Sequence, residues 1–198
     1  MHARNHDEPG AHGDDLPGEA RLADRLGKED RLEEKEDRLE EKEDRLGEED
    51  RLYRAAFDRA LRLLGQREHS RRELLTKLRS KGVDAATVGL VVDDLRGRGL
   101  QSDERFAEAF AHSRIGRGHG PIRIRQELGQ RGIDDDLADE VLTQPADYWL
   151  DLAATARRRK FSDAGPADRD DWNRQARFLA RRGFPSDLIY RLLGSASS

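Results

Sequence analysis

Cysteine is absent from this 198-residue chain, which excludes disulfide bonds, thiolate metal sites and cysteine nucleophiles together. Aromatic residues make up only 6% of the sequence and charged residues 39%, so little is left for one large core. No apolar run is long enough to cross a bilayer, and the first twenty residues lack the apolar segment of a secretory signal. We therefore expect a cytoplasmic protein with several small cores.

The usual signatures of catalysis and cofactor binding are missing as well. The sequence contains no Walker loop, no Gly-x-Gly-x-x-Gly, no His-Glu-x-x-His zinc motif and no Gly-x-Ser-x-Gly nucleophile motif. His112 and His119 are seven residues apart, but two histidines without a third ligand are usually plain surface residues. The sequence predicts no enzymatic activity, no cofactor and no metal site.

Charge is distributed unevenly along the chain. Residues 1–52 carry ten Lys/Arg against nineteen Asp/Glu, a net charge of −9, and residues 53–198 carry twenty-seven against twenty-two, a net charge of +5. The basic part is the candidate for binding a polyanion, and the acidic part can compete for the same surface. We therefore expect any binding to free DNA to be weak, independent of sequence and sensitive to salt.

What the sequence does contain is a helical unit that occurs three times. In the clearest copy, residues 117–142, Pro121 suits the first turn of a helix and Gly132 suits the left-handed residue that ends it. Two further copies align on Gly82 and Gly183, about fifty residues away on either side, and their later apolar positions also match. This pattern predicts an all-α fold of three tandem three-helix repeats.

These patterns divide the chain into five parts. Residues 1–23 are rich in Gly, Pro, Asp and His without periodicity, and we expect them to be disordered. Residues 24–52 form an acidic repeat, expected to be a charged helix or disordered. Residues 53–99, 100–144 and 145–198 are expected to form helical repeats 1, 2 and 3, because apolar residues recur there at helical spacing.

The acidic segment contains the tripeptide Asp-Arg-Leu five times between residues 24 and 52. Only one leucine falls in each heptad, whereas a two-stranded coiled coil needs two apolar positions. Pairs spaced four residues apart, such as Glu34 with Arg38, favour a solvated single helix instead. Two interpretations remain open: a charged helix with no specific role, and an acidic arm that contacts a basic surface.

Arginines on the predicted helices are the candidate partner-binding residues. A guanidinium group pairs with phosphate or carboxylate in a bidentate fork, so a row of arginines can follow a polyanion, although a solvated helix surface also explains them. On one helix, at most two of four consecutive residues can turn toward the core. The candidates are Arg114, Arg117, Arg123, Arg125, Arg131, the consecutive Arg157, Arg158, Arg159 and Lys160, and Arg174, Arg177, Arg181 and Arg182.

Four short signatures follow one another along residues 53–194. They are Arg67-Glu68-His69-Ser70 with Glu73-Leu74 and Lys77-Leu78; Asp103-Glu104-Arg105-Phe106-Ala107 with Arg114; Gly120-Pro121-Ile122-Arg123-Ile124 with Glu127-Leu128; and Phe178-Leu179-Ala180-Arg181-Arg182-Gly183-Phe184. Together they resemble the RecX proteins, which regulate the RecA recombinase. The acidic segment lies outside this resemblance, and no catalytic residue is implied.

The resemblance implies a particular architecture and partner. We expect a curved, elongated array of the three repeats, acting as a monomer in the helical groove of the RecA filament on single-stranded DNA. There it would inhibit ATP hydrolysis and strand exchange and favour filament loss. Contact with single-stranded DNA would be weak, or made only through the filament.

Two other interpretations compete with this one. In the first, one three-helix unit acts as the helix-turn-helix of a repressor. The threefold repeat weighs against it, as does Gly120-Pro121-Ile122 at a helix start in place of the Gln, Asn or Ser that read base edges. In the second, the protein is a scaffold whose charged arm is the working part.

Overall fold

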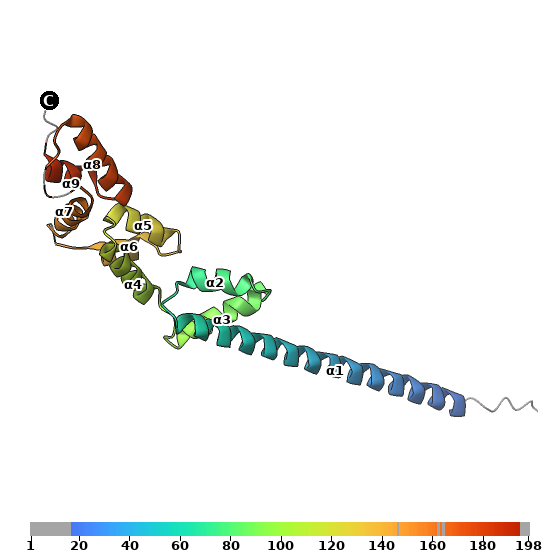
Figure 1. Cartoon of the computed structure of the whole chain (residues 1–198). Coiled ribbons are helices and arrows are strands. Elements are labelled where there is room, and N and C mark those ends of the chain that lie inside the picture. Colours follow the sequence, from blue (N-terminus) through green and yellow to red (C-terminus); the bar gives the residue numbers. More distant parts are fainter. Residues whose placement is uncertain (1–16, 146, 162, 164, 195–198) are drawn as a thin grey trace, which may run out of the picture. The chain divides into compact units, whose positions relative to one another are not determined.

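The structure is a computed structural model that describes residues 17–145, 147–161, 163 and 165–194 (Figure 1). Within these ranges all regular structure is α-helical, which confirms the all-α prediction. No helix there is long and apolar enough to span a membrane. The helices are α1 (Pro17–Leu64), α2 (Arg71–Arg79), α3 (Ala85–Gly97), α4 (Asp103–Gly116), α5 (Pro121–Gly129), α6 (Asp135–Leu142), α7 (Tyr148–Phe161), α8 (Arg169–Arg182) and α9 (Ser186–Leu193).

The chain divides into two compact units, Met1–Asp50 and Arg51–Ser198. In the first unit the described residues form a helix without a core, because every side chain from residue 31 to residue 50 is exposed. Leu32, for example, is 57% exposed. Ion pairs between residues four apart, such as Arg25 with Glu29 at 3.1 Å, are the local interactions that favour this helix.

The start of α1 differs from the prediction for residues 1–23. Helix begins at Pro17, so residues 17–23 are helical where we expected disorder. Proline suits the first turn of a helix, and a helix that is already nucleated extends at little further cost. Residues 1–16 lie outside the described part of the chain.

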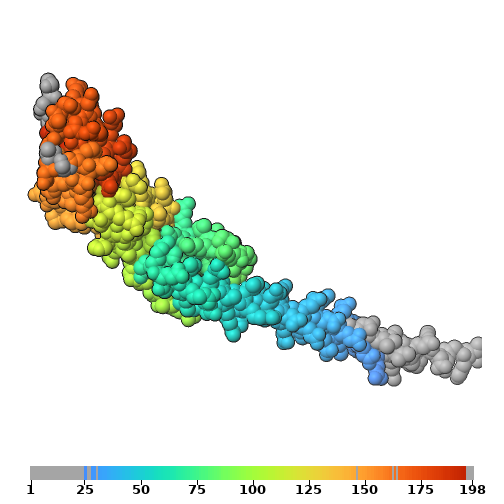
Figure 2. Space-filling view, viewed as in Figure 1, coloured from blue at the N-terminus to red at the C-terminus, as the bar shows by residue number. Residues whose placement is uncertain are grey.

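The second unit consists of three helix bundles, each with its own core, as a sequence with few aromatic residues requires. Repeat 1 is built from residues 51–64 of α1 with α2 and α3, repeat 2 from α4, α5 and α6, and repeat 3 from α7, α8 and α9. In Figure 2 these repeats follow one another in chain order from green to red. Fully buried residues anchor the cores, among them Leu74 and Leu78 in repeat 1, Phe106 and Leu128 in repeat 2, and Leu179 in repeat 3.

Side-chain caps define where several of these helices begin. Ser70 accepts a hydrogen bond from the Glu73 amide at the start of α2, and Asp134 caps α6 in the same way by accepting from the Leu137 amide. Ser102 caps α4 and leaves the carboxylate of Asp103 free to accept the backbone N–H of Arg71 at 2.7 Å. A residue at the start of repeat 2 is thereby bonded to the start of α2 in repeat 1.

Neighbouring repeats dock in one recurring way. The glycine loop that follows the second helix of one repeat lies on the start of the second helix of the repeat before it. Between repeats 1 and 2, the Ser70 hydroxyl donates to the Arg131 carbonyl at 2.7 Å. Between repeats 2 and 3, the Gly120 amide donates to the Arg182 carbonyl at 2.8 Å, and the Ile122 amide donates to the Gly183 carbonyl at 3.1 Å. The repeated sequence unit therefore also repeats an interface.

Glycine is needed in these loops for two separate reasons. Gly183 has φ +89°, a left-handed conformation that L side chains rarely adopt, and a Cβ there would clash with the backbone and Cβ of Arg123. Gly82, the matching residue of repeat 1, has φ +83° but no neighbour within 4 Å of such a Cβ. Repeat 1 does not dock on a preceding repeat. Position 82 therefore needs glycine for its left-handed backbone conformation alone, and no neighbouring residue excludes a Cβ there.

Comparing alanine at these two glycines separates the two requirements. We expect Gly183→Ala to lower the free energy of unfolding by about 2–4 kcal/mol, since it adds a steric clash to the backbone strain. Gly82→Ala should cost only about 1 kcal/mol, because it adds the strain alone. Urea denaturation followed by circular dichroism measures both. Equal losses would show that the docked loop does not constrain this position.

Candidate functional site

A cleft of about 330 Å³ lies where repeat 2 meets repeat 3. Its apolar lining comes from Ile115 at the end of α4, Leu152 and Ala156 on α7, and Phe178 on α8. Four cationic side chains also line it, and no carboxylate does; the cations are Arg117, Arg159, Lys160 and Arg182. We call this the basic cleft. It brings together members of the arginine set that are up to 65 residues apart in sequence.

Arg182 is held in the basic cleft by backbone atoms. Its Nη1 donates to the Arg117 carbonyl at 2.7 Å and to the Gly118 carbonyl at 3.2 Å, and its guanidinium lies 4.8 Å from the Phe178 ring centroid. The carbonyls satisfy donors without cancelling the charge, and the aromatic face fixes the plane of the group. The loop that docks repeat 3 on repeat 2 thus also positions a full positive charge.

The other three cations of the basic cleft are exposed. The side chains of Arg117, Arg159 and Lys160 have no ion-pair or hydrogen-bond partner among the described residues. Such groups can exchange bound water for phosphate or carboxylate without breaking an internal salt bridge. The basic cleft is therefore suited to bind an anionic group with an apolar part.

A second hollow, of about 420 Å³, is lined by two carboxylates, Glu68 and Glu73, and by four arginines, of which Arg117 also lines the basic cleft. It lies where repeat 1 meets α4. Arg114 pairs with Glu127 at 2.6 Å, and Arg131 lies 3.5 Å from a carboxylate oxygen of Glu73. Both guanidinium groups stack on Phe110, at 4.6 and 4.5 Å from its ring centroid. These two predicted binding residues therefore have a structural role in joining helices.

Most of the remaining arginines of the predicted set also have internal partners. Arg123 pairs with Glu127 at 2.9 Å, and Arg125 with Asp139 at 3.1 Å. The other contacts are Arg158 with Asp163 at 3.8 Å, Arg174 with Asp171 at 2.5 Å, and Arg177 with the Asn173 carbonyl at 3.2 Å. Arg181 is exposed and lies outside the basic cleft, beside Ile122 and Arg123. Among the candidates other than the buried Arg157, those without a carboxylate partner in the described residues are Arg117, Arg159, Lys160, Arg177, Arg181 and Arg182.

Arg157 is the member of residues 157–160 that turns toward the core, which removes it from the candidate binding residues. Its side chain is only 8% exposed, and its Nε donates to the side-chain carbonyl of Gln175 at 2.7 Å. It lies four residues after Ala153, on the face of α7 that packs against α8, so it cannot meet a partner. The sequence analysis did not identify Gln175 as a buried partner. The signal for its burial is the spacing of four residues from Leu179, which places both on one face of α8.

Two histidines occupy matching positions at the repeat junctions, each two residues before the first residue of a second helix. His69 is 2% exposed, and its Nδ1 lies 2.9 Å from Glu73. The Nδ1 of His119 is buried without a hydrogen-bond partner in the described structure. Burial lowers the pKa of both, and the charges of Arg67 beside His69 and of Arg123 beside His119 lower it further. Both imidazoles are neutral at pH 7.

Glu73 links the junction of repeats 1 and 2 electrostatically. Burial acts to raise the pKa of this carboxyl, but hydrogen bonds from Arg67 and His69 and the charge of Arg67 lower it more, so it is ionised. No group of three His, Asp or Glu side chains suited to a metal ion occurs in the described part of the chain.

Comparison with known families identifies all three repeats. The first, second and third three-helix domains of RecX match residues 56–95, 102–142 and 146–193 respectively. The regulatory protein RecX of Halorhodospira halophila is 50% identical over 135 residues, covering 68% of this chain and 84% of that protein. That of Legionella pneumophila is 41% identical over 143 residues, covering 72% and 95% respectively. Residues 1–50 lie outside all three domain matches.

Solved structures match over the same part of the chain. The crystal structure of RecX from Lactobacillus salivarius aligns with a TM-score of 0.61 at 23% identity, covering 71% of this chain and 94% of that one. A second crystal structure, of a regulatory protein RecX, also gives a TM-score of 0.61, at 25% identity and 72% coverage of this chain and 71% of that one. These likenesses support the three-repeat fold.

Charge reversal distinguishes the buried from the exposed members of residues 157–160. We expect Arg157→Glu to lower the free energy of unfolding by about 3 kcal/mol or more, because it buries a carboxylate beside the carbonyl oxygen of Gln175. Arg159→Glu should change it by less than about 1 kcal/mol, since the side chain is exposed and affects only the helix dipole. Urea titration gives both values. If Arg157→Glu left the free energy of unfolding unchanged, the Arg157 side chain would not be buried as described.

The junction histidines predict a dependence of stability on pH. Their folded pKa values lie below the unfolded value of about 6.5, so the unfolded chain binds more protons and stability falls as the pH drops through that value. We expect His119→Gln to reduce the loss of melting temperature between about pH 7.5 and pH 5. His112→Gln, at an exposed position, is the control and should leave that loss unchanged. An identical pH profile for both variants would contradict the role of His119.

Proposed function

This chain belongs to the RecX family of regulatory proteins, which modulate RecA, and from that premise we propose that it binds the RecA filament on single-stranded DNA and inhibits its ATPase, strand exchange and growth. It is a regulator and not an enzyme. The observation that carries the proposal at the level of residues is the basic cleft. In it, cations from repeats 2 and 3 meet without a carboxylate.

The three-repeat unit suits a long, repetitive partner. Helical repeats that contact only their neighbours present extended surfaces, and a nucleoprotein filament offers an equally extended one. A regulator that lies across several filament subunits affects more than one of them at once. We therefore propose that inhibition needs fewer molecules of this protein than of RecA.

Charge attraction at the basic cleft supplies the salt-sensitive part of this binding. The cleft offers four cations, so it can neutralise at most four phosphates. For single-stranded DNA, the slope of log affinity against log salt concentration is about −0.7 for each phosphate, which limits the cleft's contribution to about −3. Free DNA binding is accordingly weak, and the filament is the proposed target.

The proposal is tested by titrating the protein into a RecA ATPase assay with single-stranded DNA. We expect inhibition at substoichiometric amounts, and none at an equimolar ratio would refute the proposed function. The double change Arg159→Glu with Lys160→Glu should weaken inhibition at least tenfold, because paired interfacial charges commonly couple by about 1.5–7 kcal/mol. Its melting temperature should stay close to the parent's, since both side chains are exposed.

A matched control comes from repeat 1. Arg79 and Lys81 are also exposed cations at the end of a helix, without ion-pair partners in the described residues. Arg79→Glu with Lys81→Glu changes the net charge by the same amount and leaves the basic cleft intact. We expect this control to inhibit like the parent. If both double variants lost inhibition equally, total charge rather than the basic cleft would be responsible.

A further inference from the structure

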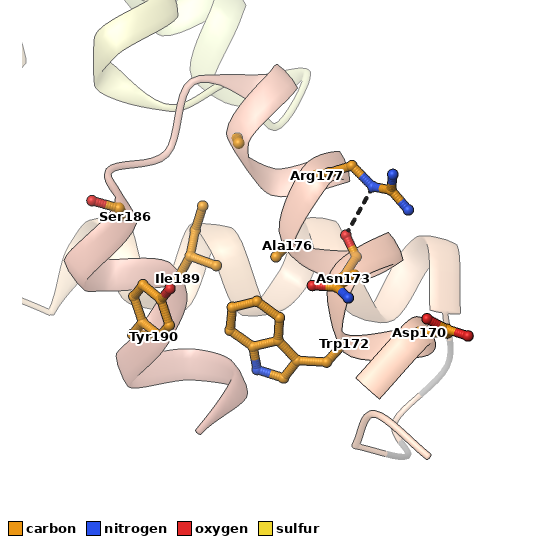
Figure 3. Close-up of a pocket in the computed structure, with 9 residues that line it drawn as sticks. Asp170, Trp172, Asn173, Ala176, Arg177, Ser186, Ile189 and Tyr190 are labelled. Carbon is orange, nitrogen blue, oxygen red and sulfur yellow. Dashed lines mark hydrogen bonds between the residues drawn. The ribbon is translucent and has the colours of Figure 1, made fainter. Parts of the chain in front are cut away.

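Another hollow, formed within repeat 3, differs in chemistry from the basic cleft. It measures about 510 Å³ and lies between α8 and α9, and none of its lining residues belongs to the basic cleft. Figure 3 shows the rings of Trp172 and Tyr190 side by side, with Asn173 and Arg177 farther along α8. The ring centroids of Trp172 and Tyr190 are 5.2 Å apart. We call this the aromatic groove.

The aromatic groove combines one fixed and one free aromatic side chain. Trp172 is held in place because its Nε1 donates to the Gly194 carbonyl at 2.9 Å. Tyr190 is 58% exposed, and its hydroxyl has no hydrogen-bond partner among the described residues. The neighbouring Ile189 and Leu193 already supply α9's contribution to the core, so the fold does not require an aromatic ring at position 190.

The lining of the aromatic groove favours a protein over a nucleic acid. The charged residues that line it are Asp170 and Arg177, so the net charge of the lining is zero. The basic cleft, by contrast, carries four cations and no carboxylate. A neutral surface offers phosphates no attraction, and charge dominates the affinity of proteins for nucleic acids. Trp, Tyr and Arg are the residues that most often dominate protein–protein binding energy, and Asn and Ser add adaptable hydrogen bonds at such surfaces.

The floor of the aromatic groove leaves room for an inserted side chain. Ala176 and Ala180 lie along α8 and are small, while Ile189 adds an apolar wall from α9. The polar groups of Asn173 and Ser186 lie at its edge, and neither side chain has a hydrogen-bond partner in the described structure. An apolar centre with solvent-accessible polar groups around it matches the organisation of protein interfaces.

We propose that the aromatic groove receives an apolar side chain from a protein partner, which on the proposed function is a RecA protomer. Repeat 3 then contacts the filament at two points of different chemistry. The basic cleft supplies a salt-sensitive charge contact, and the aromatic groove supplies an apolar contact that salt weakens little.

Affinity measurements at two salt concentrations test this division. We expect Tyr190→Ala to weaken binding to RecA filaments on single-stranded DNA roughly thirtyfold at both low and high salt, the effect of removing a central interface aromatic. Tyr190→Phe keeps the ring and should bind like the parent, which also shows that the position tolerates substitution. Leu90→Ala removes an equally exposed apolar side chain of repeat 1, 65% exposed, and should leave affinity unchanged.

Photo-crosslinking identifies what enters the aromatic groove. With p-benzoylphenylalanine in place of Tyr190, irradiation of the filament complex should give an adduct with RecA protein, and the same group in place of Leu90 should not. An adduct with DNA alone, or unchanged affinity of Tyr190→Ala, would overturn the proposal while leaving the proposed function standing. Failure of the parent protein to inhibit RecA would instead refute the proposed function, and with it RecA as the occupant.

Discussion

The docking of a glycine loop on the start of the preceding repeat's helix is the constraint on which the rest of the folded unit depends. Each three-helix bundle is too small to bury much apolar surface alone, so the repeats must contact one another closely. At the junction of repeats 2 and 3, only a glycine at position 183 lets the backbones approach, and two amide-to-carbonyl bonds then fix the register. The same loop carries Arg182, so the interface that joins the repeats also builds the basic cleft.

Charge compensation determines which arginines can meet a partner. Glu73 and Glu127 each collect cationic side chains near a junction, where the ion pairs and the stacking on Phe110 bind helices together. The basic cleft contains no such carboxylate, so its cations keep their full charge. A count of arginines therefore overestimates the binding surface, because arginine serves both to hold helices together and to attract a polyanion.

Repeat 3 differs from the other repeats in what it exposes. It contributes Arg159, Lys160 and Arg182 to the basic cleft, and it alone forms the aromatic groove. Two contacts of different chemistry on one small bundle combine long-range attraction with short-range apolar recognition. On the proposed function, the first contribution helps the protein to find the filament and the second helps to hold one position on it.

The sequence by itself determined the all-α class, the three repeats and the glycines that end their second helices, because helical periodicity and positive-φ glycines are local properties. It also determined that the basic charge lies after residue 52. Only the tertiary structure decided that Arg157 is buried against Gln175, that Arg114 and Arg131 are neutralised, and that Arg117, Arg159, Lys160 and Arg182 share a cleft. These outcomes depend on which face of a helix meets another helix and on partners up to 65 residues away, and helical spacing within one segment contains neither.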